Sequence, residues 1–206
     1  MSELSVWSCP DNFGDLLGPE ILRRLNYRVR IVENMGDADL VACGSIIDMV
    51  APAARPGCIV WGAGLMNPEA VDISHLDVRA VRGRLTADAL ALQGLPLADP
   101  GVLVPELWSR PPVRHRLGVV RHYVDAEPYP WADVQITTRA SVDEVIDFIG
   151  SCERIVSSSL HGLVVASAWG IPCVRVHHPD VLGGNFKWLD WMSGASSLEE
   201  LLAVLP

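Results

Sequence analysis

Ile155-Val-Ser-Ser-Ser-Leu-His-Gly-Leu-Val-Val-Ala-Ser-Ala-Trp-Gly-Ile-Pro172 is the stretch that decides the fold. Its β-branched start predicts a strand at Ile155–Ser157, and the apolar run after the serines predicts a helix at Leu160–Trp169. Gly170 and the proline that follows end this helix and lead into a second strand at Cys173–Val176. Strand, helix and strand joined by short connections are typical of a parallel sheet covered by helices.

The same alternation extends over the rest of the chain. Further strands are predicted at 4–8, 29–32, 40–43, 58–61, 78–81, 98–104, 117–121 and 134–137. Further helices are predicted at 15–25, with Pro19 in its first turn, and at 85–92, 141–150, 186–192 and 197–204. We therefore predict an α/β protein with two Rossmann-like lobes, each built on a parallel sheet, and a cleft between them. The N-terminal lobe spans 1–108, a linker with two prolines spans 109–116, and the C-terminal lobe spans 117–206.

Composition narrows the class of protein. Of the 206 residues, 50% are hydrophobic and 20% are charged, which is enough apolar material for a sizeable core. The net charge of −9 and the absence of any Lys/Arg run argue against a nucleic-acid partner. Five cysteines, an odd number without a CxxC pair, favour a reduced, cytoplasmic protein over a disulfide framework. The N-terminus does not have the pattern of a signal peptide, and no window is apolar enough for membrane insertion.

The junction after the strand at 155–157 is the first candidate site. In a parallel sheet it lies at the carboxyl end of a strand, where open α/β folds bind ligands. Ser158, Ser159 and the free N–H groups of the next turn can hold phosphate or carboxylate, and Gly162 lets a ligand approach. His161 can donate or accept a proton near neutral pH. The alternative is a capped core helix with an incidental histidine.

Other candidates follow predicted strands. Arg82 comes directly after a strand and carries a planar fork that suits an anion, although a surface arginine is an equal alternative. His122 and Asp125 follow the first strand of the second lobe, where a plain polar loop is equally compatible. His177-His178 has no third ligand nearby, so we expect no metal site. The remaining substrate-binding candidates are Asn12, Gly14, Lys187 and the turn residues Gly44, Ser45, Gly62 and Gly64, and Asp15 is a further catalytic candidate. For Asn12, Gly14 and Asp15 a simple helix cap is the stronger alternative.

Taken together, these motifs resemble the polysaccharide pyruvyl transferase family, in the branch of succinoglycan- and xanthan-type ketal-forming enzymes. The matching segments occur in the family's order and span nearly the whole chain. They are Asn12-Phe-Gly-Asp15, Gly44-Ser-Ile46, Val60-Trp-Gly-Ala-Gly64, Val81-Arg-Gly83, Asp99-Pro-Gly101, His122-Tyr-Val-Asp125, Ser158-Ser-Leu-His-Gly162 and Phe186-Lys-Trp-Leu-Asp190. The resemblance implies a GT-B-like arrangement of the two lobes. It also implies transfer of pyruvate from phosphoenolpyruvate to a saccharide as a cyclic ketal, in exopolysaccharide or cell-surface glycan biosynthesis.

The resemblance also implies roles for the candidates. His161 would be the catalytic acid/base, and Asp15 and Asp125 would be further catalytic residues that orient or deprotonate the acceptor. The donor's anionic groups would be held by Arg82, Lys187, Ser158, Ser159 and Gly162. The N-terminal lobe would hold the acceptor, including a lipid-linked oligosaccharide, and the C-terminal lobe the donor, with no cofactor. Two alternatives stay open: a GT-B-type glycosyltransferase that uses a nucleotide sugar, and a non-catalytic sugar-binding derivative. The oligomeric state is open.

Overall fold

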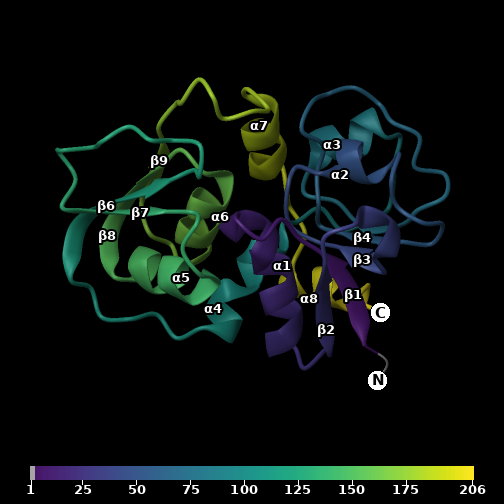
Figure 1. Ribbon diagram of the computed structural model, residues 1–206, viewed down its shortest axis with the longest axis horizontal. Helices are drawn as coiled ribbons and strands as arrows, with labels where there is room; N and C mark the ends of the chain where they lie inside the picture. Colours follow the sequence, from purple (N-terminus) through teal and green to yellow (C-terminus); the bar gives the residue numbers. More distant parts are fainter. Residues whose placement is uncertain (1–2) are drawn as a thin grey trace. The chain divides into compact units, whose positions relative to one another are not determined.

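The computed structural model describes residues 3–206, which form two compact units, each made of separate stretches of chain (Figure 1). Unit 1 contains the chain up to Cys9, then Gly18–Pro100 and Gly183–Pro206. Unit 2 contains Pro10–Leu17 and Gly101–Leu182. These boundaries differ from the contiguous lobes expected from the sequence, because each unit takes a segment from the other end of the chain.

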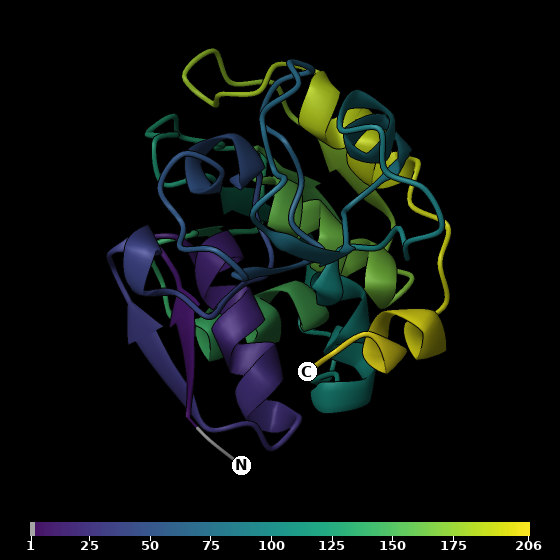
Figure 2. The same ribbon diagram turned by 90° about the vertical axis from the view of Figure 1, so that its right-hand side faces the viewer.

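Unit 1 is built on a five-stranded parallel sheet in the order β2-β1-β3-β4-β5. Figure 2 shows β1 and β2 side by side, and Leu4 of β1 is in register with Val29 of β2. The strands are β1 Leu4–Trp7, β2 Val29–Val32, β3 Leu40–Val41, β4 Ile59–Trp61 and β5 Asp77–Ala80. The helical elements that belong wholly to this unit are η1 Met35–Asp37, α2 Ile47–Val50, α3 Arg84–Ala89, α7 Phe186–Met192 and α8 Leu198–Ala203.

Unit 2 is built on a four-stranded parallel sheet in the order β7-β6-β8-β9. The strands are β6 His115–Arg121, β7 Val134–Thr137, β8 Cys152–Ser157 and β9 Cys173–Arg175. Its helices include α4 Val104–Leu107, α5 Val142–Gly150 and α6 Leu160–Ala168. The α/β class and the two parallel sheets predicted from the sequence are thus confirmed.

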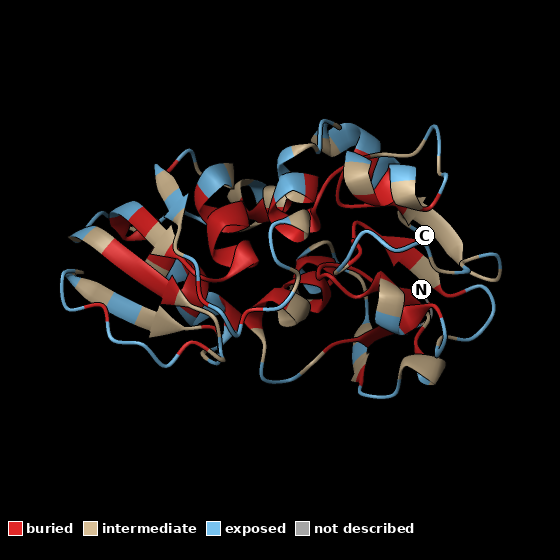
Figure 3. Ribbon diagram, turned by 90° about the horizontal axis from the view of Figure 1, so that it is seen from above, coloured by how far each residue is buried: buried red, intermediate tan, exposed pale blue. Residues whose placement is uncertain are grey.

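Helix α6 is buried in unit 2 because it is apolar on every side. Seven of its nine residues are buried, including Val164 and Val165, and Figure 3 colours the buried residues of each unit red. A helix without a polar face has to be buried all round. Gly162 allows α6 to lie close to the sheet, since a Cβ at this position would be 2.4 Å from Ser157 Oγ and 3.0 Å from Val120 Cγ1. The position of the α6 N-terminus at the strand ends is therefore fixed by packing.

Three local predictions need correction. The predicted strand at 98–104 is instead η2 Pro100–Leu103 followed by α4, since prolines at 100 and 105 cannot donate ladder hydrogen bonds. Helix α1, Phe13–Arg24, begins two residues earlier than predicted, so that Pro19 lies inside it rather than in its first turn. The segment predicted as a linker packs within unit 2, where Arg110 Nε donates to Gly150 O at 3.1 Å.

None of the helices in the described part of the chain combines the length and the apolar character that a membrane span requires.

Candidate functional site

Strands β6 and β8 define the point in unit 2 where a ligand site is expected. The chain adds β7 on one side of β6 and then β8 on its other side, so the strand order reverses between β6 and β8. In open parallel sheets ligands bind outside the carboxyl ends of the strands at such a switch point. His122 follows β6 there, and Ser158 follows β8.

Ser158 links the two strand ends. Its hydroxyl accepts a hydrogen bond from the His122 backbone N–H at 2.9 Å and donates one to Asp125 Oδ2 at 2.5 Å. The three residues were predicted as site residues from two motifs, and the structure brings them into one hydrogen-bonded group. Ser158 is therefore part of the framework that holds the loop after β6 against the end of β8.

Asp125 is the centre of this group. Its Oδ2 also accepts from the Tyr129 hydroxyl at 2.9 Å, and its Oδ1 accepts from the Glu127 N–H at 3.0 Å. His178 Nε2 lies 3.5 Å from Oδ1, while His178 Nδ1 accepts from the Asp180 N–H at 3.3 Å. The Asp125 side chain is fully buried, so these contacts replace the hydration that the carboxylate has lost. A carboxylate with this many partners is better suited to organising its neighbours than to removing a proton from a substrate.

The charge of Asp125 affects Tyr129. Burial and the hydrogen bond to Asp125 raise the pKa of the Tyr129 phenol to about 12. The neutral phenol can donate to the carboxylate, whereas a phenolate beside it would be repelled. Tyr129 therefore stays a hydrogen-bond donor over the whole ordinary pH range.

The first turn of α6 follows directly from this framework. Ser157 Oγ accepts from the Ser159 N–H at 3.0 Å, which sets the turn between strand and helix. Ser159 is the N-cap residue and makes no side-chain capping bond. The leading N–H groups of a helix and its positive end favour anions. Gly162, predicted to admit a ligand, leaves room for the Ser157 side chain, whose Oγ would lie 2.4 Å from a Cβ at this position.

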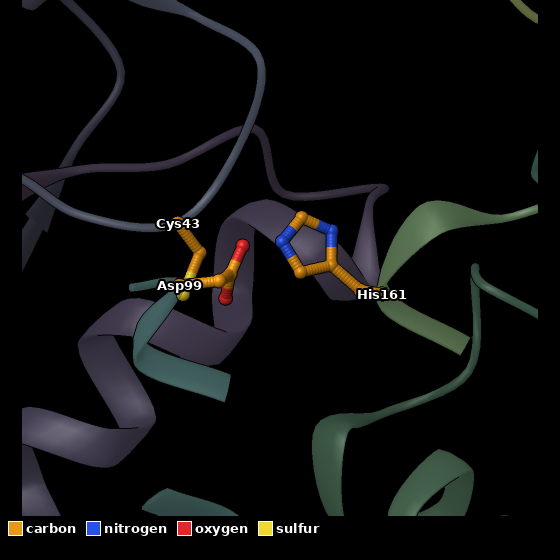
Figure 4. Close-up of side chains that lie close together, drawn as sticks. All are labelled: Cys43, Asp99 and His161. Atoms are coloured by element: carbon orange, nitrogen blue, oxygen red, sulfur yellow. The ribbon is translucent and has the colours of Figure 1, made fainter. Parts of the chain in front are cut away.

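His161 lies in this first turn and is buried. Figure 4 shows its imidazole pointing away from α6 toward the first turn of α1. That turn carries Gly14, and a Cβ built on this glycine would lie only 2.2 Å from His161 Nδ1. Two motifs separated by almost 150 residues of sequence thus meet within unit 2.

The turn that carries Gly14 is held by its own polar groups. Asn12 Oδ1 accepts from the Gly14 N–H at 3.2 Å, and Asn12 Nδ2 donates to Asp15 Oδ2 at 3.0 Å. The Phe13 N–H donates to Thr138 O, beyond β7, at 2.8 Å. Asn12 and Asp15, predicted respectively as ligand-binding and catalytic residues, thus order the start of α1 in this structure.

Arg82 lies in unit 1 and is completely buried in a network of its own. Its Nε donates to Asp190 Oδ2 at 2.9 Å, and its Nη groups donate to Ser45 Oγ and Leu65 O. Asp190 also accepts from the backbone N–H and the hydroxyl of Thr86, both at 2.7 Å. Burial lowers the pKa of the Arg82 guanidinium, and the Asp190 carboxylate acts in the opposite direction. The fork predicted to bind an anionic substrate here binds a carboxylate of its own chain.

Several predicted turn residues surround this network. A Cβ on Gly64 would lie 2.4 Å from Arg82 Cζ, so the glycine makes room for the guanidinium. Gly44 and Gly62 both have positive φ angles, and Gly64 N–H donates to Gly44 O at 2.9 Å. Cys43 and Asp99, the other two side chains in Figure 4, are buried neighbours within unit 1. These turns pack the inside of unit 1.

Helix α7 carries Asp190 on its buried side, where the carboxylate pairs with Arg82. The helix buries Lys187, Trp188 and Asp190, and it exposes Leu189 and Met192. This reverses the usual orientation of an amphipathic helix, and the partner for Asp190 on the buried side is Arg82. Lys187 Nζ lies 5.6 Å from the centre of the Trp188 ring, a cation–π distance.

The predicted site residues thus divide between the two units. Unit 2 contains Asn12, Gly14, Asp15, His122, Asp125, Ser158, Ser159, His161 and Gly162. Unit 1 contains Gly44, Ser45, Gly62, Gly64, Arg82 and Lys187. The sequence analysis did not identify Tyr129 and His178 as partners of Asp125, or Asp190 as the partner of Arg82, because none of these contacts has a local sequence signal.

Comparisons with known proteins indicate the family of the chain. A family model described as polysaccharide pyruvyl transferase matches residues 4–178. The chain is 29% identical over 165 residues to the succinoglycan biosynthesis protein ExoV of Rhizobium meliloti (strain 1021), covering 74% of this chain and 52% of that protein. It is 25% identical over 196 residues to the uncharacterized protein L143 of Acanthamoeba polyphaga mimivirus, covering 81% of this chain and 68% of that protein. The chain therefore spans about half the length of ExoV.

Proposed function

We propose that this chain, which belongs to the polysaccharide pyruvyl transferase family, transfers a pyruvyl group from phosphoenolpyruvate to a saccharide and forms a cyclic ketal. The observation that carries the proposal is the position of His161, buried in the first turn of α6 at the switch point of unit 2. The similarity to a succinoglycan biosynthesis protein supports an exopolysaccharide as the acceptor. A lipid-linked oligosaccharide acceptor and a GT-B-like arrangement of the lobes stay predictions from the family resemblance.

Each stage of the proposed reaction needs a proton transfer and a group that stabilises the phosphate or carboxylate of phosphoenolpyruvate. Protonation of the methylene carbon of phosphoenolpyruvate leaves an oxocarbenium-like centre at C2. A saccharide hydroxyl attacks C2 and releases its proton, the bond from C2 to the phosphate oxygen breaks, and a second hydroxyl closes the ketal. The proton of the first hydroxyl returns to the catalytic group that protonated the methylene carbon. The proton of the second hydroxyl leaves with inorganic phosphate.

Unit 2 offers groups for these steps. His161 has a side chain that can give a proton to the methylene carbon and take one from the attacking hydroxyl. Ser159, the N-cap residue of α6, and the N-terminal end of that helix would hold phosphate or carboxylate. Asp125, Ser158 and His178 would keep the loops after β6, β8 and β9 in place around them.

Arg82 and Lys187 take a different part in this proposal. Because the Arg82 guanidinium is fully buried against Asp190, it would have to leave that carboxylate before it could bind a substrate. We therefore assign Arg82 to the stability of unit 1. Lys187 stays a prediction as an anion-binding residue, and Asp15 stays one as a base near the acceptor.

The test combines ligand binding with turnover on the same samples. Phosphoenolpyruvate should raise the melting temperature. At 100 times its Kd it should add about 2.7 kcal/mol to the free energy of unfolding, if only the folded state binds it. With an acceptor glycan it should release inorganic phosphate. His161→Ala and His161→Gln should stay folded, should bind phosphoenolpyruvate and should lose turnover by about 10²–10⁴-fold. His177→Ala is the matched control, since His177 is exposed and should be dispensable.

Other outcomes would indicate a different function or a different role for His161. Stabilisation by a nucleotide sugar in place of phosphoenolpyruvate would indicate a glycosyltransferase. Binding of phosphoenolpyruvate or a glycan without phosphate release would indicate a non-catalytic derivative. Retention of activity in His161→Gln alone would assign His161 to hydrogen bonding, and full specific activity of His161→Ala would refute the proposed mechanism.

A further inference from the structure

Gly14 and His161 make a contact that no other residue at position 14 could make. Gly14 lies in the first turn of α1 and His161 in the first turn of α6, both in unit 2. A Cβ on Gly14 would lie 2.2 Å from Nδ1 of the imidazole and 2.9 Å from both Cγ and Cε1. Distances below 3.0 Å essentially never occur for real Cβ atoms, so the ring occupies the space that a side chain would need.

The backbone at position 14 does not itself require glycine. Gly14 is helical and is not among the residues of positive φ. Alanine is a better helix former than glycine, so considerations of helix stability alone would favour alanine at this position. The contact with the imidazole is therefore what explains the glycine.

Both partners are anchored, so neither can move away easily. The start of α1 is tied to the end of β7 by the Phe13 N–H bond to Thr138 O at 2.8 Å, and Asn12 holds the Gly14 N–H. His161 belongs to α6, whose residues from Leu160 to Ala166 are buried. An added methyl group at position 14 would therefore act mainly on the imidazole, which can rotate.

We infer that Gly14 is a positioning residue that fixes the orientation of the His161 imidazole. Its expected effect on catalysis rests on the proposed function, but the contact and the ring orientation do not. Gly14, which the sequence analysis placed among the substrate-binding residues, thereby acquires a role through His161.

A double-mutant cycle tests the contact. Gly14→Ala should lower the melting temperature when His161 is present and should not lower it in a His161→Ala background, where the methyl group has room. Gly36→Ala is the control, because its Cβ would meet no atom closer than 3.4 Å, and it should have little effect in either background. Equal effects of Gly14→Ala in the two backgrounds, or no effect in either, would overturn the inference. If Gly14→Ala fails to fold alone, recovery of folding in the double variant supports it.

Ring spectroscopy tests the orientation. In protein with ¹⁵N-labelled histidine, the ring resonances of His161, identified by their loss in His161→Ala, should shift in Gly14→Ala. The other five histidines should be unchanged. Under the proposed function kcat should fall while the Kd for phosphoenolpyruvate changes little. A shifted ring in a protein that never releases phosphate would refute the proposed function and leave the positioning role intact. An unshifted ring would refute the positioning role whatever the activity.

Discussion

Asp125 holds four neighbouring groups around one buried carboxylate, and the consequence is measurable at Tyr129. Because the pKa of Tyr129 is raised from 10.0 to about 12 in the folded protein, the neutral phenol is favoured by folding. Its contribution to stability is complete below pH 10 and is lost as the pH rises toward 12. Tyr129→Phe should therefore be less stable than wild type below pH 10, and this difference should shrink toward pH 12. Urea unfolding midpoints across this range measure it.

A matched control is Tyr123→Phe, because Tyr123 takes no part in the hydrogen bonds of Asp125. Its stability difference from wild type should not change in the same way with pH. A Tyr129→Phe difference that stays constant from pH 9 to pH 12 would show that Asp125 does not hold the phenol in its neutral form.

Single residues were predictable where a local pattern determines them. His161, Ser158 and Asp125 follow strand ends, and strand ends can be recognised from β-rich runs followed by polar residues. The partner of Arg82 could not be predicted, because Asp190 lies 108 residues away and no short-range pattern reports such a contact. The contact between Gly14 and His161 could not be predicted for the same reason.

At the scale of elements, α5 shows how a local signal sets a helix terminus. Ser141-Val-Asp-Glu144 has the sequence pattern of a capping box, and the structure contains one: the Ser141 N–H donates to Glu144 Oε2 at 2.9 Å, and the Glu144 N–H donates to Ser141 Oγ at 3.4 Å. The Ser141 hydroxyl and, to a lesser degree, the Ser141 N–H lower the pKa of Glu144, because both donate to its carboxylate.

Ser141→Ala should cost about 1 kcal/mol of unfolding free energy, since one helix N–H group loses its acceptor. The loss should be smaller at a pH low enough to protonate Glu144, because the reciprocal bond from Ser141 to the carboxylate then weakens in wild type as well. Chemical denaturation at neutral and acidic pH measures both values. Ser197→Ala in α8 provides a second capping box for comparison. An unchanged midpoint in both variants would show that these caps do not contribute to stability.

The strand β8, helix α6 and strand β9 were predicted closely because an apolar helix between two β-rich runs allows few other structures. The segment at 98–104 was predicted wrongly because its apolar residues outweighed Pro100 and the proline that follows at 105. Pro100 also packs where a Cβ on Gly62 would lie, at 2.3 Å from its Cδ, and that contact is not visible in the sequence. The short helices α2 and α4, of four residues each, are below the length at which periodicity is informative.

At the scale of the whole molecule, unit 1 depends on the ion pair that joins its distant segments. Arg82 and Asp190 are both fully buried. Asp190→Asn leaves the guanidinium without its charged partner in a dry interior, which typically costs about 3–5 kcal/mol. Arg82→Lys should also destabilise, because an ammonium cannot reproduce the fork that binds Asp190, Ser45 and Leu65. Thermal or urea unfolding measures both losses.

Asp147→Asn is the control for charge removal alone. Asp147 pairs with Arg114 in a contact that is about half exposed on both sides, so its loss should cost no more than about 1 kcal/mol. If Asp190→Asn costs no more than this control, the network around Arg82 does not stabilise unit 1.

The division into units was the least predictable feature. The two prolines near residue 111 have the local composition of a linker, but Gly150 lies so close to Pro111 that a Cβ there would be 2.5 Å from its Cδ. Membership of a unit is decided by contacts between segments far apart in the chain. Local composition carries no information about such contacts.

The interleaved order of the units has a consequence for biosynthesis. As the chain leaves the ribosome, all of unit 2 has been synthesised by residue 182, whereas unit 1 still lacks the segment from Gly183 onward. Until α7 emerges, Arg82 has no carboxylate partner at position 190, and the interior around it cannot close. We expect a nascent chain that ends its native sequence at residue 182, followed by a linker long enough to bring that residue out of the ribosome, to protect unit 2 from protease while unit 1 stays sensitive. During translation the sheet synthesised first would then be the last to become resistant.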